Sequence, residues 1–317
     1  MSRVRDAGFD RIGTPAYKAA STAAQNLPEP VVSFVASMLG VGFGAGMRSR
    51  RAMIERHLRR VDPSLRGAAL RRVTQAAFEH YAHYWSDSFR LPGLSAQEVD
   101  TVFSYEGFAH VDDALVAGGG VVLAMPHLGG WEWAGRWVAE QGVPITVVVE
   151  PIDPPELFEW FVSFRRSLGM TVVPVGPDAG RAVLAALRQN EVVCLLCDRD
   201  IQGGGVSVEF FGERTTLPAG PATLGLRTGA PILPTAVYFT SERDGHHGVI
   251  RPPVPSERQG KLRDDVARIT QDIAHELEWL IRRAPEQWHL FQPNWPSDPG
   301  YYEKSRSELG KRHGEAT

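Results

Sequence analysis

The stretch "VVLAMPHLGGWEWAGRW", residues 121–137, changes its pattern of apolar residues part-way along. An apolar run ends at Met125, Pro126 interrupts it, and an amphipathic segment starts at Trp131. This order predicts a strand, a turn and a helix. His127 therefore lies directly after the carboxyl end of a predicted strand.

Further apolar runs rich in β-branched residues follow at intervals along the chain. They predict strands at 120–125, 144–149, 170–175, 192–197 and 231–239, with helices at 131–141, 154–168, 179–189, 219–228 and 264–283. Strands that are apolar throughout are buried on both faces, which is typical of a parallel sheet. We expect an α/β fold with a mostly parallel central sheet flanked by helices.

The composition, 43% apolar and 22% charged, is that of an ordinary folded protein. We expect a helical, basic, membrane-facing part at 1–93, an α/β core at 94–296 and a loosely held polar tail at 297–317. Within the core, residues 240–265 read as a loop-rich hairpin. His246 and His247 are expected on its solvated surface.

Charge is unevenly distributed along the chain. Residues 1–72 carry 13 Lys/Arg and 5 Asp/Glu, a net charge of +8. Because the whole chain has a net charge of −3, residues 73–317 have a net charge of −11. Such a basic region could meet nucleic acid or an anionic membrane surface. The neighbouring apolar segment at 30–47 favours the membrane and argues against nucleic acid as a partner.

The same segment is interrupted by glycines and is shorter than the roughly 20 apolar residues that span a bilayer. Its position does not suit a secretory signal. We therefore expect a peripheral protein on the cytoplasmic face of the plasma membrane. The alternative is that residues 16–40 form ordinary core helices whose arginines are solvated.

The only two cysteines, Cys194 and Cys197, lie in the apolar run "VVCLLC". A redox or metal site would require a turn between them or a second pair of ligands, and the sequence has neither. We expect buried thiols and no metal.

Polar residues follow three of the predicted strands, where parallel sheets usually hold their chemistry. They are His127, Glu150 and the run Asp198-Arg199-Asp200. A histidine can remove a proton from a hydroxyl if a carboxylate fixes its tautomer. Asp198 is the favoured partner, because the ends of neighbouring strands face one opening. The alternative is Glu132, five residues after the histidine in the first turn of a helix.

Gly129 and Gly130 lie at the predicted start of that helix. Their backbone N–H groups suit the oxyanion that forms at an attacked thioester carbonyl. The sequence has no G-x-S-x-G nucleophile motif, which argues against a covalent acyl-enzyme. It also lacks the glycine pattern of dinucleotide-binding enzymes.

Three segments together, "PHLGGWE" (126–132), residues 147–175 and residues 195–239, resemble the lipid A late acyltransferase superfamily. The resemblance extends over about residues 75–295 and is greatest to the actinobacterial phosphatidylinositol mannoside acyltransferases. It implies a fold similar to the glycerolipid acyltransferases and a peripheral membrane enzyme. Such an enzyme moves a fatty acyl chain from acyl-CoA, its co-substrate, to a sugar hydroxyl of a membrane glycolipid, without a further cofactor.

The resemblance also implies roles for individual residues. His127 matches the general base, Asp198 its acidic partner, and Glu132 the acid of a motif in which four residues separate a histidine from an acid. Glu150 matches an acid that holds the acceptor sugar, and Arg165 a basic residue near the donor or headgroup. The chain departs from the family pattern at 132, where Asp is expected, and at 198, where Glu is expected.

Two further features follow from the same comparison of motifs. We expect Arg199 beside the substrate, paired with Asp198 or Asp200. The stretch at 210–224, a predicted loop leading into a helix, is expected to border the acyl-donor channel.

Two other functions are compatible with these residues. In a thioesterase or lipid hydrolase, His127 would activate water instead of an alcohol. In an acyl or glycolipid carrier, the histidine would have no catalytic role.

Overall fold

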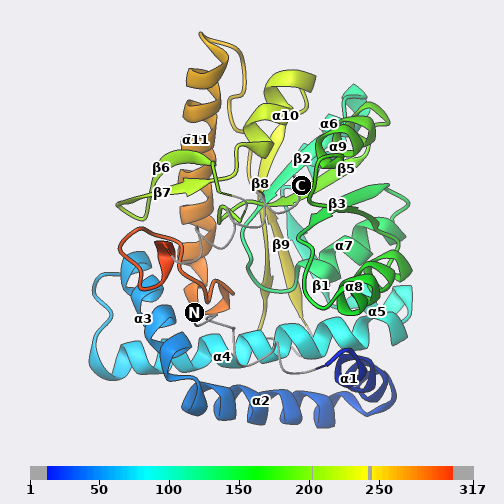
Figure 1. Cartoon of the computed structure of the whole chain (residues 1–317). Helices are drawn as coiled ribbons and strands as arrows, with labels where there is room; N and C mark the ends of the chain where they lie inside the picture. Colours follow the sequence, from blue (N-terminus) through cyan, green and yellow to red (C-terminus); the bar gives the residue numbers. More distant parts are fainter. Residues whose placement is uncertain (1–12, 202, 242–244, 303–317) are drawn as a thin grey trace, which may run out of the picture.

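The computed structural model describes residues 13–201, 203–241 and 245–302, and its centre is a seven-stranded sheet (Figure 1). The strand order is β1-β9-β8-β2-β5-β3-β4. The strands are β1 (Phe103–Glu106), β2 (Val121–Met125), β3 (Ile145–Val149), β4 (Thr171–Pro174), β5 (Val192–Leu196), β8 (Ile232–Phe239) and β9 (His246–Ile250). From β8 to β4 all neighbours are parallel, whereas β9 is antiparallel to β8 and pairs with β1 in parallel. The predicted α/β fold with a mostly parallel sheet is confirmed.

Helices α1 to α5 precede the sheet in the sequence, helices α6 to α10 lie between its strands, and α11 follows the last strand. They are α1 (Thr14–Asn26), α2 (Glu29–Gly46), α3 (Arg48–Val61), α4 (Gly67–Arg90), α5 (Ala96–Thr101), α6 (Ala109–Ala117), α7 (Trp131–Glu140), α8 (Pro155–Ser167), α9 (Ala179–Arg188), α10 (Gly220–Thr228) and α11 (Leu262–Arg283), with short 3-10 turns η1 (Leu91–Gly93) and η2 (Pro285–Gln287).

The strand β2 shows why its sequence is apolar throughout. Successive side chains of a strand point to opposite faces. Val122 and Ala124 pack on one face in a cluster with α9, α10 and α11. Val121, Leu123 and Met125 pack on the other face with α6, α7 and α8. All five side chains are buried, so neither face of the sheet tolerates a polar residue here.

Two strands form a hairpin outside the main sheet. β6 (Val206–Phe210) and β7 (Glu213–Leu217) pair antiparallel, and Phe211 at the turn has a φ of 52°. The expectation of a loop over 210–224 is therefore wrong for its first half. Each strand has five residues and alternates between exposed and buried side chains. An alternation this short, with turns on both sides, is only a weak indication of a strand in the sequence.

His246 also differs from the expectation of a solvated surface. It belongs to β9, is 1% exposed, and its ring stacks on Trp133 with centroids 4.4 Å apart. Its Nε2 lies 3.6 Å from a carboxylate oxygen of Asp87 on α4. Helices α7 and α4 thus cover a strand that the sequence alone presented as a polar loop. Its neighbour His247 is partly exposed and bonds through Nδ1 to Ser104 Oγ at 2.8 Å.

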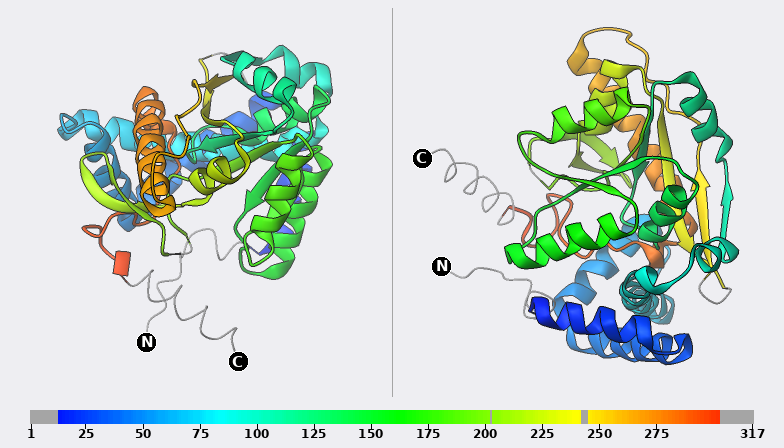
Figure 2. Two further views of the ribbon diagram at one scale, coloured as in Figure 1. Left: turned by 90° about the horizontal axis from the view of Figure 1, so that it is seen from above. Right: turned by 90° about the vertical axis from the view of Figure 1, so that its right-hand side faces the viewer.

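The helices α1 to α4 form a separate layer at one end of the sheet (Figures 1 and 2). Within it α4 contacts the carboxyl ends of the parallel strands. His80 stacks on Phe239, the last residue of β8, and Tyr84 donates to Glu132 at the start of α7. Helix α2 packs on the outer side of α4. Within the residues that the structure describes, none of the helices combines the length and apolar character that crossing a bilayer requires.

The chain after α11 returns over the sheet as residues 285–298, here called the C-terminal segment, which begins with η2 and is otherwise irregular. Its last residue, Asp298, is buried and accepts hydrogen bonds from the backbone N–H groups of Asn294 and Trp295. Its carboxylate lies 3.3 Å from His57 Nε2 and 2.7 Å from Arg60 on α3. The predicted loosely held tail is thus wrong for Asp298. The expectations for 1–12 and 303–317 fall outside the described residues.

We expect Asp298→Asn to destabilise the fold, because the change leaves His57 and Arg60 facing a neutral partner. Removing one member of a buried ion pair costs about 3 kcal/mol. Burial alone would raise the pKa of Asp298, but the hydrogen bonds of His57, Asn294 and Trp295 lower it below the ordinary value. The stabilisation is therefore present at neutral pH and is lost as the pH falls below about 4.

Urea unfolding of both proteins between pH 7 and pH 3 tests this expectation. The matched control is Asp178→Asn, since Asp178 pairs with Arg181 in solvent, with 85% of its side chain exposed. A loss of stability as small as that of the control, or one that does not shrink with acid, would contradict the role of Asp298.

Candidate active site

The turn after β2 holds His127 tightly against the sheet. The N–H of Leu128 donates to Pro126 O, and Gly129 has a φ of 59°. A Cβ at Gly129 would lie 1.8 Å from the carbonyl oxygen of Val237 in β8. Only glycine therefore allows the turn both its left-handed backbone and its close approach to the neighbouring strand.

Asp198 reaches His127 from the next strand. β2 and β5 are parallel neighbours in which Met125 lies opposite Leu196, so the residues after both strands emerge side by side. His127 Nδ1 lies 2.6 Å from Asp198 Oδ1, and the backbone N–H of His127 donates to Oδ2 at 3.1 Å. The Asp198 side chain is 0% exposed and that of His127 is 22% exposed. With Nδ1 held by the carboxylate, Nε2 is the ring nitrogen left for a substrate.

The surroundings of Asp198 keep it ionised. Its Oδ2 accepts a 2.7 Å hydrogen bond from the indole N–H of Trp288, and the side chain of Asn294 donates to its backbone carbonyl. Burial alone would raise the pKa of Asp198. The charge of His127 and the hydrogen bonds of His127 and Trp288 outweigh burial and lower the pKa to about 2. A charged carboxylate fixes the tautomer of the imidazole.

Glu132 lies in a different cluster. Its Oε1 accepts from the hydroxyl of Tyr84 at 2.7 Å and from the guanidinium of Arg165 at 3.0 Å. Glu132 is 2% exposed, and burial raises its pKa although Arg165 and Tyr84 act in the opposite direction. Arg165 also lies 4.8 Å above the ring of Trp131. Of the two carboxylates considered for His127, the structure brings Asp198 to the ring and uses Glu132 to join α4, α7 and α8.

Glu150 and Arg199 form an ion pair at the carboxyl ends of two neighbouring strands. Glu150 follows β3 and Arg199 follows β5, and the two side chains are 3.2 Å apart. The Glu150 side chain is 38% exposed and thus remains open to a ligand. The expected pairing of Arg199 with Asp198 or Asp200 is wrong. The carboxylate of Asp200 instead holds the backbone of the loop that leads to β6.

The two glycines at the start of α7 differ in what they can offer to an oxyanion. The N–H of Gly129 donates to the carbonyl of Gln287 at 3.0 Å, so this group is already bound. The expectation that Gly129 stabilises the oxyanion is therefore withdrawn. Gly130, the N-cap residue of α7, stays a prediction for that role.

Sequence reasoning missed Trp288 and His289 in the C-terminal segment. The N–H of His289 donates to His127 O at 2.7 Å, and its ring lies against Tyr81 and Tyr84 of α4. Burial, with smaller effects of His80 and His127, lowers the pKa of His289 to about 3, so the ring is neutral. The segment has no periodic pattern, and nothing in its sequence indicated contact with His127.

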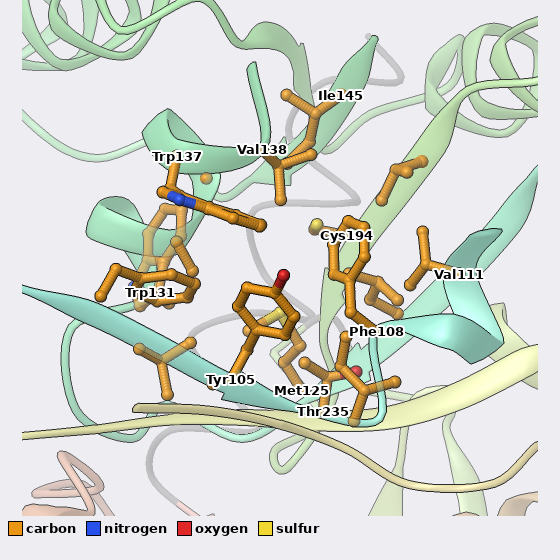
Figure 3. A pocket seen from close by; sticks show the side chains of 18 of the residues that line it. Tyr105, Phe108, Val111, Met125, Trp131, Trp137, Val138, Ile145, Cys194 and Thr235 are labelled. Atoms are coloured by element: carbon orange, nitrogen blue, oxygen red, sulfur yellow. The ribbon is translucent and has the colours of Figure 1, made fainter. Parts of the chain in front are cut away.

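An apolar cavity lies between α7 and the sheet (Figure 3). It holds about 600 Å³ of empty space, part of it open to solvent. Met125 and Trp131, which flank His127 in the sequence, belong to its wall, together with Trp137 and Cys194 (Figure 3). The thiol of Cys194 is protonated, since burial raises its pKa to about 12.

Across the ranges 13–201, 203–241 and 245–302, no group of three or more His, Cys, Asp or Glu side chains is placed to hold a metal ion.

The comparison with known sequences identifies the family of the chain. The family of bacterial lipid A biosynthesis acyltransferases matches residues 10–297, nearly the whole chain. The chain belongs to this family. It is therefore an acyltransferase, and the His127–Asp198 pair lies in the matched region.

Individual relatives show which members of the family the chain is similar to. A phosphatidylinositol mannoside acyltransferase of Mycobacterium tuberculosis (strain ATCC 25618 / H37Rv) is 39% identical over 244 residues, 75% of this chain and 74% of the relative. One of Mycolicibacterium smegmatis is 36% identical over 276 residues, 84% and 88% of the two chains. A lipid A biosynthesis acyltransferase of Haemophilus influenzae is 23% identical over 254 residues, 79% and 77% of the two chains.

We expect Gly129→Ala to destabilise this acyltransferase by about 4 kcal/mol or more, because the new methyl group must displace β8 or the turn. The matched control is Gly118→Ala at the end of α6. Gly118 also has a positive φ, 83°, but its Cβ would meet nothing within 4 Å. It should cost about 1 kcal/mol, from backbone strain alone. Urea unfolding measures both, and equal losses would show that the turn is not pressed against Val237.

Proposed function

We propose that this protein transfers a long fatty acyl chain from acyl-CoA to a sugar hydroxyl of a membrane glycolipid, the mannose of a phosphatidylinositol mannoside. The observation that carries the proposal is a buried carboxylate that holds the ring of His127 in a chain of an acyltransferase family. The names of the mycobacterial relatives support the choice of acceptor.

The reaction needs a base, which His127 supplies. Its Nε2 removes the proton of the sugar hydroxyl while Asp198 stabilises the imidazolium that forms. The alkoxide oxygen attacks the thioester carbonyl, giving a tetrahedral oxyanion beside Gly130. The carbon–sulfur bond then breaks, and the CoA sulfur takes the proton from the imidazolium. A new ester and free CoA result, and no group on the protein is acylated.

The cavity under α7 suits the acyl chain of the donor. Its walls are apolar side chains, the kind of lining that is typical of sites for apolar ligands. Each methylene moved from water to such a site contributes roughly 0.8 kcal/mol. His127 is not itself part of the lining, but Met125 and Trp131 are, and they lie two residues before it and four residues after it in the sequence. We therefore place the thioester between this cavity and the base.

The polar ends of β3 and β5 suit the acceptor. Glu150 is open to solvent and can accept hydrogen bonds from sugar hydroxyls, while Arg199 beside it can pair with an anionic headgroup. Arg165 is tied to Glu132 and Trp131, and its part is to fix the wall of the donor site.

Helix α2 provides a surface for docking on the membrane. Exposed apolar side chains lie along one side of it at helical spacing, Val31, Phe34, Val35, Met38 and Leu39, with 44 to 67% of each exposed. The opposite side packs on α4. Exposed arginines lie on the adjoining helices α3 and α4: Arg48, Arg59, Arg71 and Arg72. An apolar helix face beside basic residues binds anionic lipid surfaces.

Transfer is tested with labelled palmitoyl-CoA and a total lipid extract that contains phosphatidylinositol mannosides. We expect label in a glycolipid, and about 10²- to 10⁴-fold less of it with His127→Ala or Asp198→Asn at unchanged acyl-CoA binding. Glu132→Gln should chiefly lower the melting temperature. His275→Ala, a change of an exposed histidine on α11, is the control and should be fully active.

Several results would overturn the proposal. Undiminished transfer by His127→Ala would show that His127 is not the base. Label released as free fatty acid without any acceptor would indicate a hydrolase. Transfer from an acyl carrier protein thioester but not from acyl-CoA would show that the donor is not acyl-CoA.

Docking is tested by flotation with vesicles of phosphatidylinositol and phosphatidylcholine. We expect the double change Phe34→Glu and Met38→Glu to lower the bound fraction at least tenfold, since it places charges on the apolar face. Raising the salt concentration should weaken the binding of the unchanged protein. Val116→Glu is the matched control, because Val116 is 88% exposed on α6, outside the helical layer. Equal binding by all three proteins would exclude α2 as the docking face.

A further inference from the structure

The two oxygens of the Asp198 carboxylate have different partners. Oδ1 bonds to His127 Nδ1 at 2.6 Å, whereas Oδ2 accepts from the His127 backbone at 3.1 Å and from Trp288 Nε1 at 2.7 Å. The Trp288 bond is the shorter of the two on Oδ2. Two donors on one oxygen fix the rotation of the carboxylate, so that the other oxygen remains directed at the histidine ring.

Trp288 is itself held in place by the side chains around its ring. Its ring packs among aromatic side chains, with centroids 5.8 Å from His57, 5.8 Å from Phe211, 6.2 Å from Phe210 and 6.3 Å from Trp295. Trp288 is 4% exposed, so no water competes freely for its N–H group. Its ring is therefore a rigid support for the carboxylate.

The backbone around Trp288 is joined to the turn that carries His127. Trp288 forms a bridge with Leu128, the N–H of Gly129 donates to Gln287, and the N–H of His289 donates to the carbonyl of His127. The same segment therefore fixes the histidine through its backbone and the aspartate through an indole. A displacement of the segment would move both residues of the pair.

We propose that Trp288 is a positioning residue for acyl transfer, holding the Asp198 carboxylate charged and directed at His127 Nδ1. This inference rests on the proposed function. The indole does not touch the reacting atoms and acts only through Asp198.

Electrostatics support the geometric argument. Burial raises the pKa of Asp198, while the charge of His127 and the hydrogen bonds of His127 and Trp288 lower it to about 2. The other titratable groups that interact with this carboxylate are Cys197, next to it in the chain, and the ring of His289. Loss of the indole N–H should therefore raise the pKa of Asp198 and weaken its hold on the histidine.

The test compares Trp288→Phe with Trp295→Phe. Trp295 lies in the same aromatic cluster, is 0% exposed and donates its own indole N–H, at 3.1 Å, to the backbone carbonyl of Phe210. Both changes remove one buried indole hydrogen bond and leave a similar void, but only Trp288 contacts Asp198. A purely structural role would make the two variants alike.

We expect Trp288→Phe to lower kcat for transfer from palmitoyl-CoA about 10- to 100-fold, the effect of one hydrogen bond to a charged group. KM for palmitoyl-CoA should change little. Trp295→Phe should lose comparable stability in urea and keep its kcat within about twofold. Titration of the carboxyl carbon of Asp198 in ¹³C-aspartate-labelled protein, assigned with Asp198→Asn, should show a raised midpoint in Trp288→Phe alone.

Replacement of Trp288 by β-(3-benzothienyl)alanine, which keeps the ring shape but has sulfur in place of N–H, covers the case that the phenylalanine variant does not fold. Equal kcat losses in the Trp288 and Trp295 variants, or an unchanged Asp198 midpoint, would overturn the proposal. A raised midpoint in a protein that transfers no acyl group would leave the positioning intact and refute the proposed function.

Discussion

A 2.6 Å hydrogen bond joins a histidine at the end of one strand to a carboxylate at the end of the next, and the carboxylate has no access to water. A buried charge is costly unless every acceptor position has a partner. The partners of Asp198 come from the His127 backbone and ring and from Trp288. Much of the surrounding architecture can be understood as meeting this requirement. The C-terminal segment crosses the sheet ends there, and the Gly129 turn approaches β8 closely enough to keep the histidine in place.

Apolar and polar groups gather in different parts of the molecule around the sheet. Below α7 the wall of the cavity is made of apolar side chains from the sheet and the helix. At the ends of β3 and β5, Glu150 and Arg199 present charged groups to the opening. The proposed reaction between a hydrocarbon thioester and a sugar hydroxyl would use both environments. The helical layer is joined to the α/β core because Tyr84 of α4 donates to Glu132 of α7, while α2 exposes an apolar face on the other side of α4.

Glu132 illustrates how spacing in a motif can mislead about contacts. It lies five residues after His127, yet the helix that begins at Trp131 carries its side chain away from the imidazole and toward α4 and α8. There it neutralises Arg165 and accepts from Tyr84, and so ties the helical layer to the α/β core. Asp198, distant in sequence, is closer to the histidine because parallel neighbouring strands end at one edge. The topology of the sheet, more than the separation in sequence, determines which acid meets the base.

The sequence by itself determined the mostly parallel sheet and the place of the histidine. Strands such as Val121–Met125 are apolar on both faces, which only a sheet covered on two sides can bury. It also favoured Asp198 over Glu132 as the partner, because residues that follow neighbouring parallel strands emerge at one edge of the sheet. Catalytic roles for His127, Asp198, Glu150 and Arg199 remain predictions.

Only the tertiary structure decided which groups surround the pair. Trp288 and His289 lie in an irregular segment, the Gly129 N–H is bound by Gln287, and His246 is covered by helices from elsewhere in the chain. Each of these contacts joins residues that are far apart in sequence and follow no local period. Local patterns report burial and periodicity, whereas hydrogen bonds between distant segments depend on how the packed elements finally meet.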